Sequence, residues 1–278
     1  MHQRDGSGWK LERNESMKRE LVNITAERYQ EYERQILLRD QLRKEAAGTW
    51  LLYMKTFGER MTESFRLKVE CIRIKKEIGF IMQSVNAGKT LRMDEMEAHV
   101  QREMQEYQKK LDQLVQNAED GLNAKISTEY TTRKVRKLYR SIARMIHPDM
   151  HPETADNADI MNLWQRTERS YAANDLKEME KLYILARKVR EGEHVPSISF
   201  TAEELEKKIE ELKKEIHLIR TTDPYCYIEL LADENAVREK SEELQQEINE
   251  YEGYRTQLEE TKNQLLETSR LHIIWMMK

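Results

Sequence analysis

Residues 133–149 read RKVRKLYRSIARMIHPD, and this stretch decides how the rest of the chain is interpreted. Its apolar side chains recur at steps of three and four, which places them on one face of a helix: Val135, Leu138, Tyr139, Ile142 and Ile146. The rest of the helix is basic, with no acidic residue: Arg133, Lys134, Arg136, Lys137, Arg140 and Arg144. Pro148 disfavours helical geometry at the residue before it, so the helix should end at His147. The stretch predicts a strongly basic helix that ends in an exposed turn carrying an imidazole and a carboxylate.

Two further helices are predicted after this turn. The first has an apolar stripe and a length that suits an antiparallel partner for the basic helix: Ile160, Leu163, Trp164, Thr167 and Tyr171. Asp175 can cap the second, with Glu178 completing a capping box. Its stripe continues through Leu176, Met179, Leu182, Tyr183 and Ala186. The unit is therefore a basic helix, a His-Pro-Asp turn, an apolar-striped helix and a short helix.

This order of elements resembles helices II, III and IV of a J domain, the module by which DnaJ-type co-chaperones stimulate the ATPase of DnaK-type chaperones. The resemblance is carried by Tyr139, Arg140, Ala143 and the triplet His147-Pro148-Asp149, with Tyr171 at the place of the family's Ala-Tyr pair. The chain departs from the family in four ways, the first being that Ser141 and Met145 replace residues that are often basic. Ser170 replaces the Ala, Asn174 stands where a leucine is usual, and no counterpart of helix I precedes the basic helix. The helix that ends near Ala118 is a candidate for the place of helix I.

The resemblance implies a partner and a set of site residues. In the family, the His-Pro-Asp turn and the basic helix dock on the ATPase chaperone, so His147, Pro148 and Asp149 would be the trigger. Arg136 and Arg140 match places of common positive charge, and Lys137 is a nearby candidate. The core of the unit would consist of Tyr139, Ile142, Leu163, Trp164 and Tyr171. The resemblance implies no cofactor, no metal and no enzymatic reaction of the chain's own.

The flanking regions are also predicted to be helical. Residues 1–16 are expected to be a flexible tail and residues 17–125 a three-helix arm, with a break at Gly48, an end at 86–88 and a close at Gly121. Residues 126–192 form the J-like unit. Residues 193–278 are expected to form an antiparallel helical hairpin, with a capping box at Thr201 and Glu204, a break at 221–224 and a cap at Asp233. The apolar segment 271–277 is expected to pack on a neighbouring helix.

Composition agrees with an all-α, elongated protein with helical arms around a small J-like unit. Charged residues make up 35% of the chain and hydrophobic residues 38%, with 9 Gly and 4 Pro, which suits long amphipathic helices. The net charge of −4 argues against general nucleic-acid binding. Residues 1–16 contain no apolar run typical of a signal peptide, and no run approaches the ~18 apolar residues of a membrane span. Cys71 and Cys226 are expected to be reduced thiols of a cytoplasmic protein.

Several alternatives remain open. The chain could be a coiled-coil scaffold or adaptor with a degenerate J-like segment, or its basic helix could contact nucleic acid phosphates. The arms could bind a client or an adaptor, or form a homo-oligomer. A metal site at His147 and His151 is disfavoured because Pro148 and Pro152 prevent helical spacing of the two imidazoles. The segment Gly88-Lys89-Thr90 lacks the earlier glycine and the strand of a phosphate-binding loop.

Overall fold

The computed structural model describes residues 8–124, 127–192, 200–268 and 273–274, and these residues are almost entirely helical. In chain order the elements are α1 (Gly8–Asn86), β1 (Leu91–Arg92), α2 (Met93–Asn123), α3 (Glu129–Ile146), α4 (Glu153–Asp156), α5 (Ala158–Ala172), α6 (Leu176–Gly192), α7 (Ala202–Thr221), α8 (Tyr227–Ala232), α9 (Glu234–Thr268) and β2 (Ile273–Ile274). The all-α class is confirmed. Among the described residues, no helix is both long and apolar enough to cross a membrane.

The chain forms two compact units, and neither is continuous in sequence. The first combines residues 1–47 with 125–226, and the second combines residues 48–124 with 227–278. This division differs from the predicted succession of arm, J-like unit and hairpin. The J-like unit shares its compact unit with the N-terminal part of α1 and with α7. The two long helices predicted to form a C-terminal hairpin, α7 and α9, belong to different units.

Helix α1 is longer than the sequence pattern predicts. It begins at Gly8, inside the expected tail, and runs without interruption through Gly48, where a break was expected. A Cβ atom added at Gly48 would meet nothing within 4 Å, so no close contact interrupts the helix there. A glycine in a helix interior costs only about 1 kcal/mol relative to alanine, which packing on both sides of the residue can offset. The predicted end at 86–88 is confirmed, since α1 ends at Asn86 and Gly88 adopts a left-handed φ of 58°.

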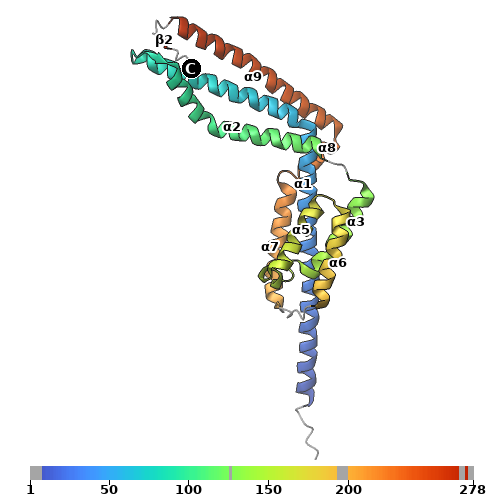
Figure 1. Ribbon diagram of the computed structural model, residues 1–278. Coiled ribbons are helices and arrows are strands. Elements are labelled where there is room, and N and C mark those ends of the chain that lie inside the picture. Colours follow the sequence, from blue (N-terminus) through green and yellow to red (C-terminus); the bar gives the residue numbers. More distant parts are fainter. Residues whose placement is uncertain (1–7, 125–126, 193–199, 269–272, 275–278) are drawn as a thin grey trace, which may run out of the picture. The chain divides into compact units, whose positions relative to one another are not determined.

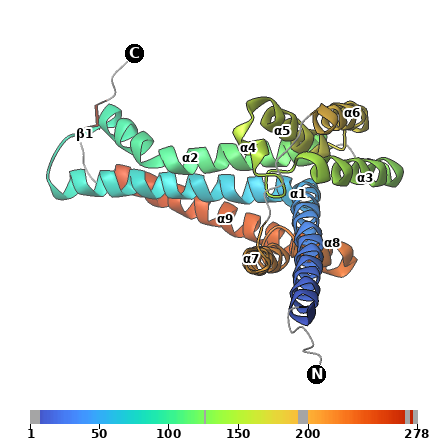
Figure 2. The ribbon, with the colours of Figure 1, turned by 90° about the horizontal axis from the view of Figure 1, so that it is seen from below.

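The second unit consists mainly of three long helices that lie side by side. Figures 1 and 2 both show α2 and α9 alongside the C-terminal part of α1. Phe57 and Met54 of α1 pack with Ala118 of α2 and Leu244 of α9 in one core cluster. Near the end of α2, Gly121 lies so close to α1 that an added Cβ would be 2.7 Å from the backbone nitrogen of Lys55. Gly121 was expected to end this helix, but α2 continues to Asn123. The glycine instead allows α1 and α2 to approach each other closely.

Two short strands complete the second unit. Leu91 and Arg92 of β1 pair in parallel with Ile273 and Ile274 of β2. The apolar segment 271–277 was expected to pack on a helix. Its described part pairs instead with a strand, and the rest of the segment lies outside the described residues.

The first unit places the J-like helices on the N-terminal part of α1. Figure 1 shows α3, α5, α6 and α7 grouped around this part of the helix. Tyr32, Ile36 and Leu37 of α1 belong to the same buried cluster as the apolar faces of α3, α5, α6 and α7. The capping box that begins α7 is present, since Thr201 and Glu204 bond to each other's backbone nitrogens. The packing of α1 in this cluster brings it against the His-Pro-Asp turn.

Candidate functional site

Helix α3 ends as its sequence predicts and begins four residues before Arg133, at Glu129. The side chain of Thr128 caps it by accepting a hydrogen bond from the backbone nitrogen of Thr131 at 3.2 Å. Its last residue is Ile146, and His147 has extended backbone angles (φ −66°, ψ 127°), as expected before a proline. The carbonyl of His147 then accepts backbone hydrogen bonds from Met150 and His151, which close a tight turn around the triplet.

The imidazole of His147 is buried, and both of its nitrogens are bonded. The residue is only 4% exposed. Its Nδ1 accepts a hydrogen bond from the backbone nitrogen of Asp149 at 3.0 Å, and its Nε2 lies 3.1 Å from Oδ2 of Asp40 in α1. Because Nδ1 accepts a bond from an N–H group, it carries no proton, and Nε2 donates to the carboxylate. The ring also packs against Trp164, with the two ring centroids 4.4 Å apart.

The carboxylate of Asp40 is the centre of a buried polar network. Its Oδ2 also accepts a hydrogen bond from the Tyr139 hydroxyl at 2.9 Å. Its Oδ1 accepts two bonds from Arg39, from Nε at 3.0 Å and from Nη2 at 2.9 Å. Burial by itself raises the pKa of Asp40, but the hydrogen bond from His147 and the charge of Arg39 outweigh it and hold this pKa below its ordinary value. The buried carboxylate is therefore ionised and fully bonded.

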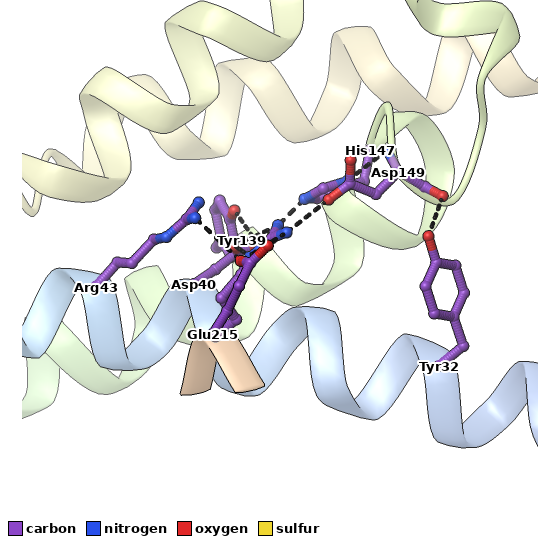
Figure 3. A network of polar contacts seen from close by, with 8 residues as sticks. Tyr32, Asp40, Arg43, Tyr139, His147, Asp149 and Glu215 are labelled. Atoms are coloured by element: carbon purple, nitrogen blue, oxygen red, sulfur yellow. Dashed lines mark hydrogen bonds and ion pairs between the residues drawn. The ribbon is translucent and has the colours of Figure 1, made fainter. Parts of the chain in front are cut away.

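Arg39 joins this network to the last residue of the triplet. Its Nη1 lies 2.8 Å from Oδ2 of Asp149 and 3.9 Å from Oε2 of Glu215 in α7. Arg43, one turn further along α1, lies 3.2 Å from the same Glu215 oxygen. The hydroxyl of Tyr32 donates to the backbone carbonyl of Asp149 at 2.9 Å. Figure 3 shows Tyr32 and Asp40 of α1 beside the turn, with Glu215 of α7 near Asp40. The turn is thus held by side chains from outside the J-like segment.

The basic residues of α3 differ in their contacts and exposure. Three of them contact polar side chains of α1: Arg136 contacts Glu45 at 3.4 Å, Arg140 contacts Gln41 at 2.9 Å, and Arg144 contacts Glu33. Arg144 nevertheless keeps 55% of its side chain exposed. Lys137 is exposed, and its side chain forms no ion pair within the described part of the chain. The helix therefore presents an exposed basic ridge, made of Lys137, Arg140 and Arg144, that leads to the turn.

All five residues expected in the core of the J-like unit are buried: Tyr139, Ile142, Leu163, Trp164 and Tyr171. The rings of Tyr139 and Tyr171 stack with their centroids 3.9 Å apart. The Lys44 amine of α1 lies 3.9 Å from the centroid of the Tyr171 ring and donates to Asn174 at 2.6 Å. Asn174 has a φ of 52°, a left-handed conformation that asparagine tolerates.

Two expectations are wrong, one about the turn and one about the helix that packs on the J-like core. The turn was expected to expose both His147 and Asp149, but His147 is buried, whereas Asp149 keeps 42% of its side chain exposed and Pro148 is half-buried. The helix that ends near Ala118 was a candidate for the missing helix I, but Ala118 packs in the second unit. The helices that pack on the J-like core are the N-terminal part of α1 and α7.

The residues that hold the turn were not found from the sequence. Asp40 follows Tyr32 and Ile36 at steps of four, so it lies on the apolar stripe of its own helix. A carboxylate on such a stripe is a signal that a buried partner exists, because an unpaired buried charge is costly. The stripe does not identify His147, 107 residues later, as that partner. Comparison of the chain with protein-family models, with curated proteins and with solved structures found no significant match.

Proposed function

We propose that this chain is a J-domain-type co-chaperone that docks on a DnaK-type chaperone and stimulates its ATPase. The observation that carries the proposal is the exposed carboxylate of Asp149, which lies in a His-Pro-Asp turn at the end of the exposed basic ridge of α3. An antiparallel second helix, α5, packs on α3 in the same core. The proposal derives a function from the resemblance of the J-like unit, residues 126–192, to J domains.

The accessible groups define the contact surface that the proposal requires. They are Asp149, Pro148 and the basic ridge, whereas the buried His147 acts by fixing the turn. A partner for this surface would have acidic residues opposite the ridge and a cationic group opposite Asp149. Complementary charges of this kind mainly raise the rate of encounter and set the orientation of docking.

The test is steady-state ATP turnover by a DnaK-type chaperone from the same organism, with increasing amounts of this chain. Lys137→Glu should raise the concentration needed for half-maximal stimulation, since this side chain lies on the ridge and forms no internal ion pair that folding requires. The same reversal at Lys177, which is exposed in the first turn of α6, is the matched control and should have little effect. Stimulation by the wild type should also weaken with salt, because screening shortens the reach of charges to ~8 Å near physiological ionic strength.

Two results would count against this function. If the wild type leaves ATP turnover unchanged, docking of the proposed kind does not occur. If Lys137→Glu and Lys177→Glu are equally active, the ridge of α3 is not the contact surface. Asp149→Asn should lower stimulation in the same assay, although this change also removes the ion pair with Arg39.

One observation favours a second function, that of a helical scaffold in which the triplet has only a structural role. His147 is buried and bonded on both nitrogens, which is the environment of a core residue. In this case the long helices α1, α2 and α9 would carry the interactions of the protein. The scaffold predicts no change in ATP turnover by any DnaK-type chaperone, together with a strong loss of stability when His147 is replaced.

A further inference from the structure

We infer that Asp40 of α1 is a positioning residue for the docking turn: it holds His147 directly and Asp149 through Arg39. The inference rests on the proposed function and adds to it a residue that lies about a hundred positions before the turn. Nothing in the triplet's own sequence neighbourhood indicates this dependence. A part of α1 thereby takes the place of the missing helix I and supplies the side chains that fix the turn.

Side chains of α1 hold the turn at three points. Asp40 accepts from Nε2 of His147 at 3.1 Å. Arg39, bound to Asp40 through two nitrogens, lies 2.8 Å from the Asp149 carboxylate. Tyr32 donates to the Asp149 carbonyl at 2.9 Å. Together these contacts fix the ring of His147, the carboxylate of Asp149 and the backbone between α3 and α4. A group preorganised in this way loses less conformational freedom when a partner binds it.

The contacts at the turn differ in kind from those along the rest of α3. Arg39 and Asp40 are buried, as are the neighbouring Ile36 and Leu37 in the core of the first unit. The contact of Arg136 with Glu45 is partly exposed, as is that of Arg144 with Glu33 beside the turn. Exposed ion pairs contribute only about 0–1 kcal/mol, so a partner can exchange them at little cost. The buried contacts stay in place while the ridge remains available for docking.

Asp40 also stabilises the tautomer of His147 in which Nε2 carries the proton. The turn needs Nδ1 as an acceptor for the backbone nitrogen of Asp149, and this leaves Nε2 as the donor. A carboxylate opposite Nε2 favours that tautomer, and the Tyr139 hydroxyl, 2.9 Å from the same oxygen, orients the carboxylate. Without Asp40, the ring has no acceptor for its Nε2 proton within this network.

The experiment uses the full chain with three substitutions, titrated into the ATP-turnover assay with a DnaK-type chaperone. Asp40→Asn keeps the shape of the side chain but removes the charge opposite Arg39, and we expect a rise of about tenfold in the half-saturating concentration. Tyr32→Phe removes only the hydroxyl bound to Asp149 and keeps the ring in the core, so a smaller rise is expected. Glu33→Gln is the control, since it neutralises an acid on α1 that contacts the ridge and not the turn, and it should change the value less than twofold.

A second measurement separates positioning from simple stabilisation. Long-range proton–nitrogen NMR correlations of the His147 ring should show a protonated Nε2 and an unprotonated Nδ1 in the wild type. They should show a mixture of tautomers in Asp40→Asn at a temperature where circular dichroism shows both proteins folded. If Asp40→Asn does not fold, Tyr32→Phe provides the comparison in the turnover assay.

The outcomes distinguish the inference from the function on which it rests. A wild type that stimulates turnover, with Asp40→Asn and Tyr32→Phe equal to Glu33→Gln, overturns the inference and leaves the co-chaperone function intact. An unchanged His147 tautomer in Asp40→Asn also overturns it. A wild type without stimulation overturns the proposed function and the docking role of Asp40 together. A loss of stimulation in Asp40→Asn with a changed tautomer supports the inference.

Discussion

The Nε2 atom of His147 lies 3.1 Å from Oδ2 of Asp40, and both residues are buried. This hydrogen bond joins the end of α3 to a helix that begins near the N-terminus of the chain. It makes the His-Pro-Asp turn a part of the core of the first unit. Its consequences for stability and for titration can be measured without any partner protein.

The first prediction concerns the strength of this contact. Asp40→Ala should lower the free energy of unfolding of the first unit by about 3 kcal/mol, because it leaves a buried imidazole, a buried hydroxyl and Arg39 without their common acceptor. His147→Gln should cost about 2 kcal/mol through the loss of a charge-assisted hydrogen bond. Hydrogen exchange followed by mass spectrometry can assign each loss to the first unit. The double variant should lose less than the sum, and strictly additive losses would mean that the two side chains are not coupled.

The second prediction concerns acid pH. The folded-state pKa of Asp40 lies below its ordinary value, so the unfolded chain binds the proton more tightly. The contribution of Asp40 to stability is therefore complete above the ordinary pKa of about 4 and is lost as the pH falls through the lower folded-state pKa. Thermal melts between neutral and acid pH should show a steeper acid loss for the wild type than for Asp40→Asn. Parallel curves for the two proteins would contradict the lowered pKa.

The third prediction concerns Lys44 at alkaline pH. Burial, with the charge of Arg136 added to it, lowers the pKa of Lys44 to about 8, from an ordinary value near 10.5. Between these two values the unfolded chain holds more protons than the folded chain, so the Lys44 contribution to stability rises with pH in this window. The stability of the wild type relative to Lys44→Met should therefore increase from pH 8 to pH 10. A constant difference would show that the contact of the charged amine with the Tyr171 ring outweighs burial.

The fourth prediction concerns helix contact in the second unit. Gly121→Ala should be destabilising, since the added Cβ would lie 2.7 Å from the backbone nitrogen of Lys55 and helices α1 and α2 would have to separate. Gly79→Ala, in α1 of the same unit, is the matched control, because nothing lies within 4 Å of its added Cβ. It should stabilise the unit by about 0.5–1 kcal/mol through helix propensity. Chemical denaturation of both variants tests the pair, and equal effects would exclude the close approach of the two helices.

Much of the fold followed from the sequence because helices are local structures. The stripe from Val135 to Ile146 fixed the buried face of α3, and Pro148 fixed its end, since both effects act within a few residues. The capping box of Thr201 and Glu204 and the left-handed stop at Gly88 are local in the same sense. The break expected at Gly48 failed because glycine only weakens a helix, and the packing of α1 decides whether it continues.

The same distinction between local and long-range effects applies to the candidate site. By itself, the sequence determined the all-α class, the basic helix, the position of the His-Pro-Asp turn and the five core residues of the J-like unit. Only the tertiary structure decided that His147 is buried, that Asp40 and Arg39 hold the turn, and that the N-terminal part of α1 packs on α3, α5, α6 and α7. The physical reason is the range of the interactions: a hydrophobic stripe reports that a face is buried, and it does not identify the distant segment that covers it.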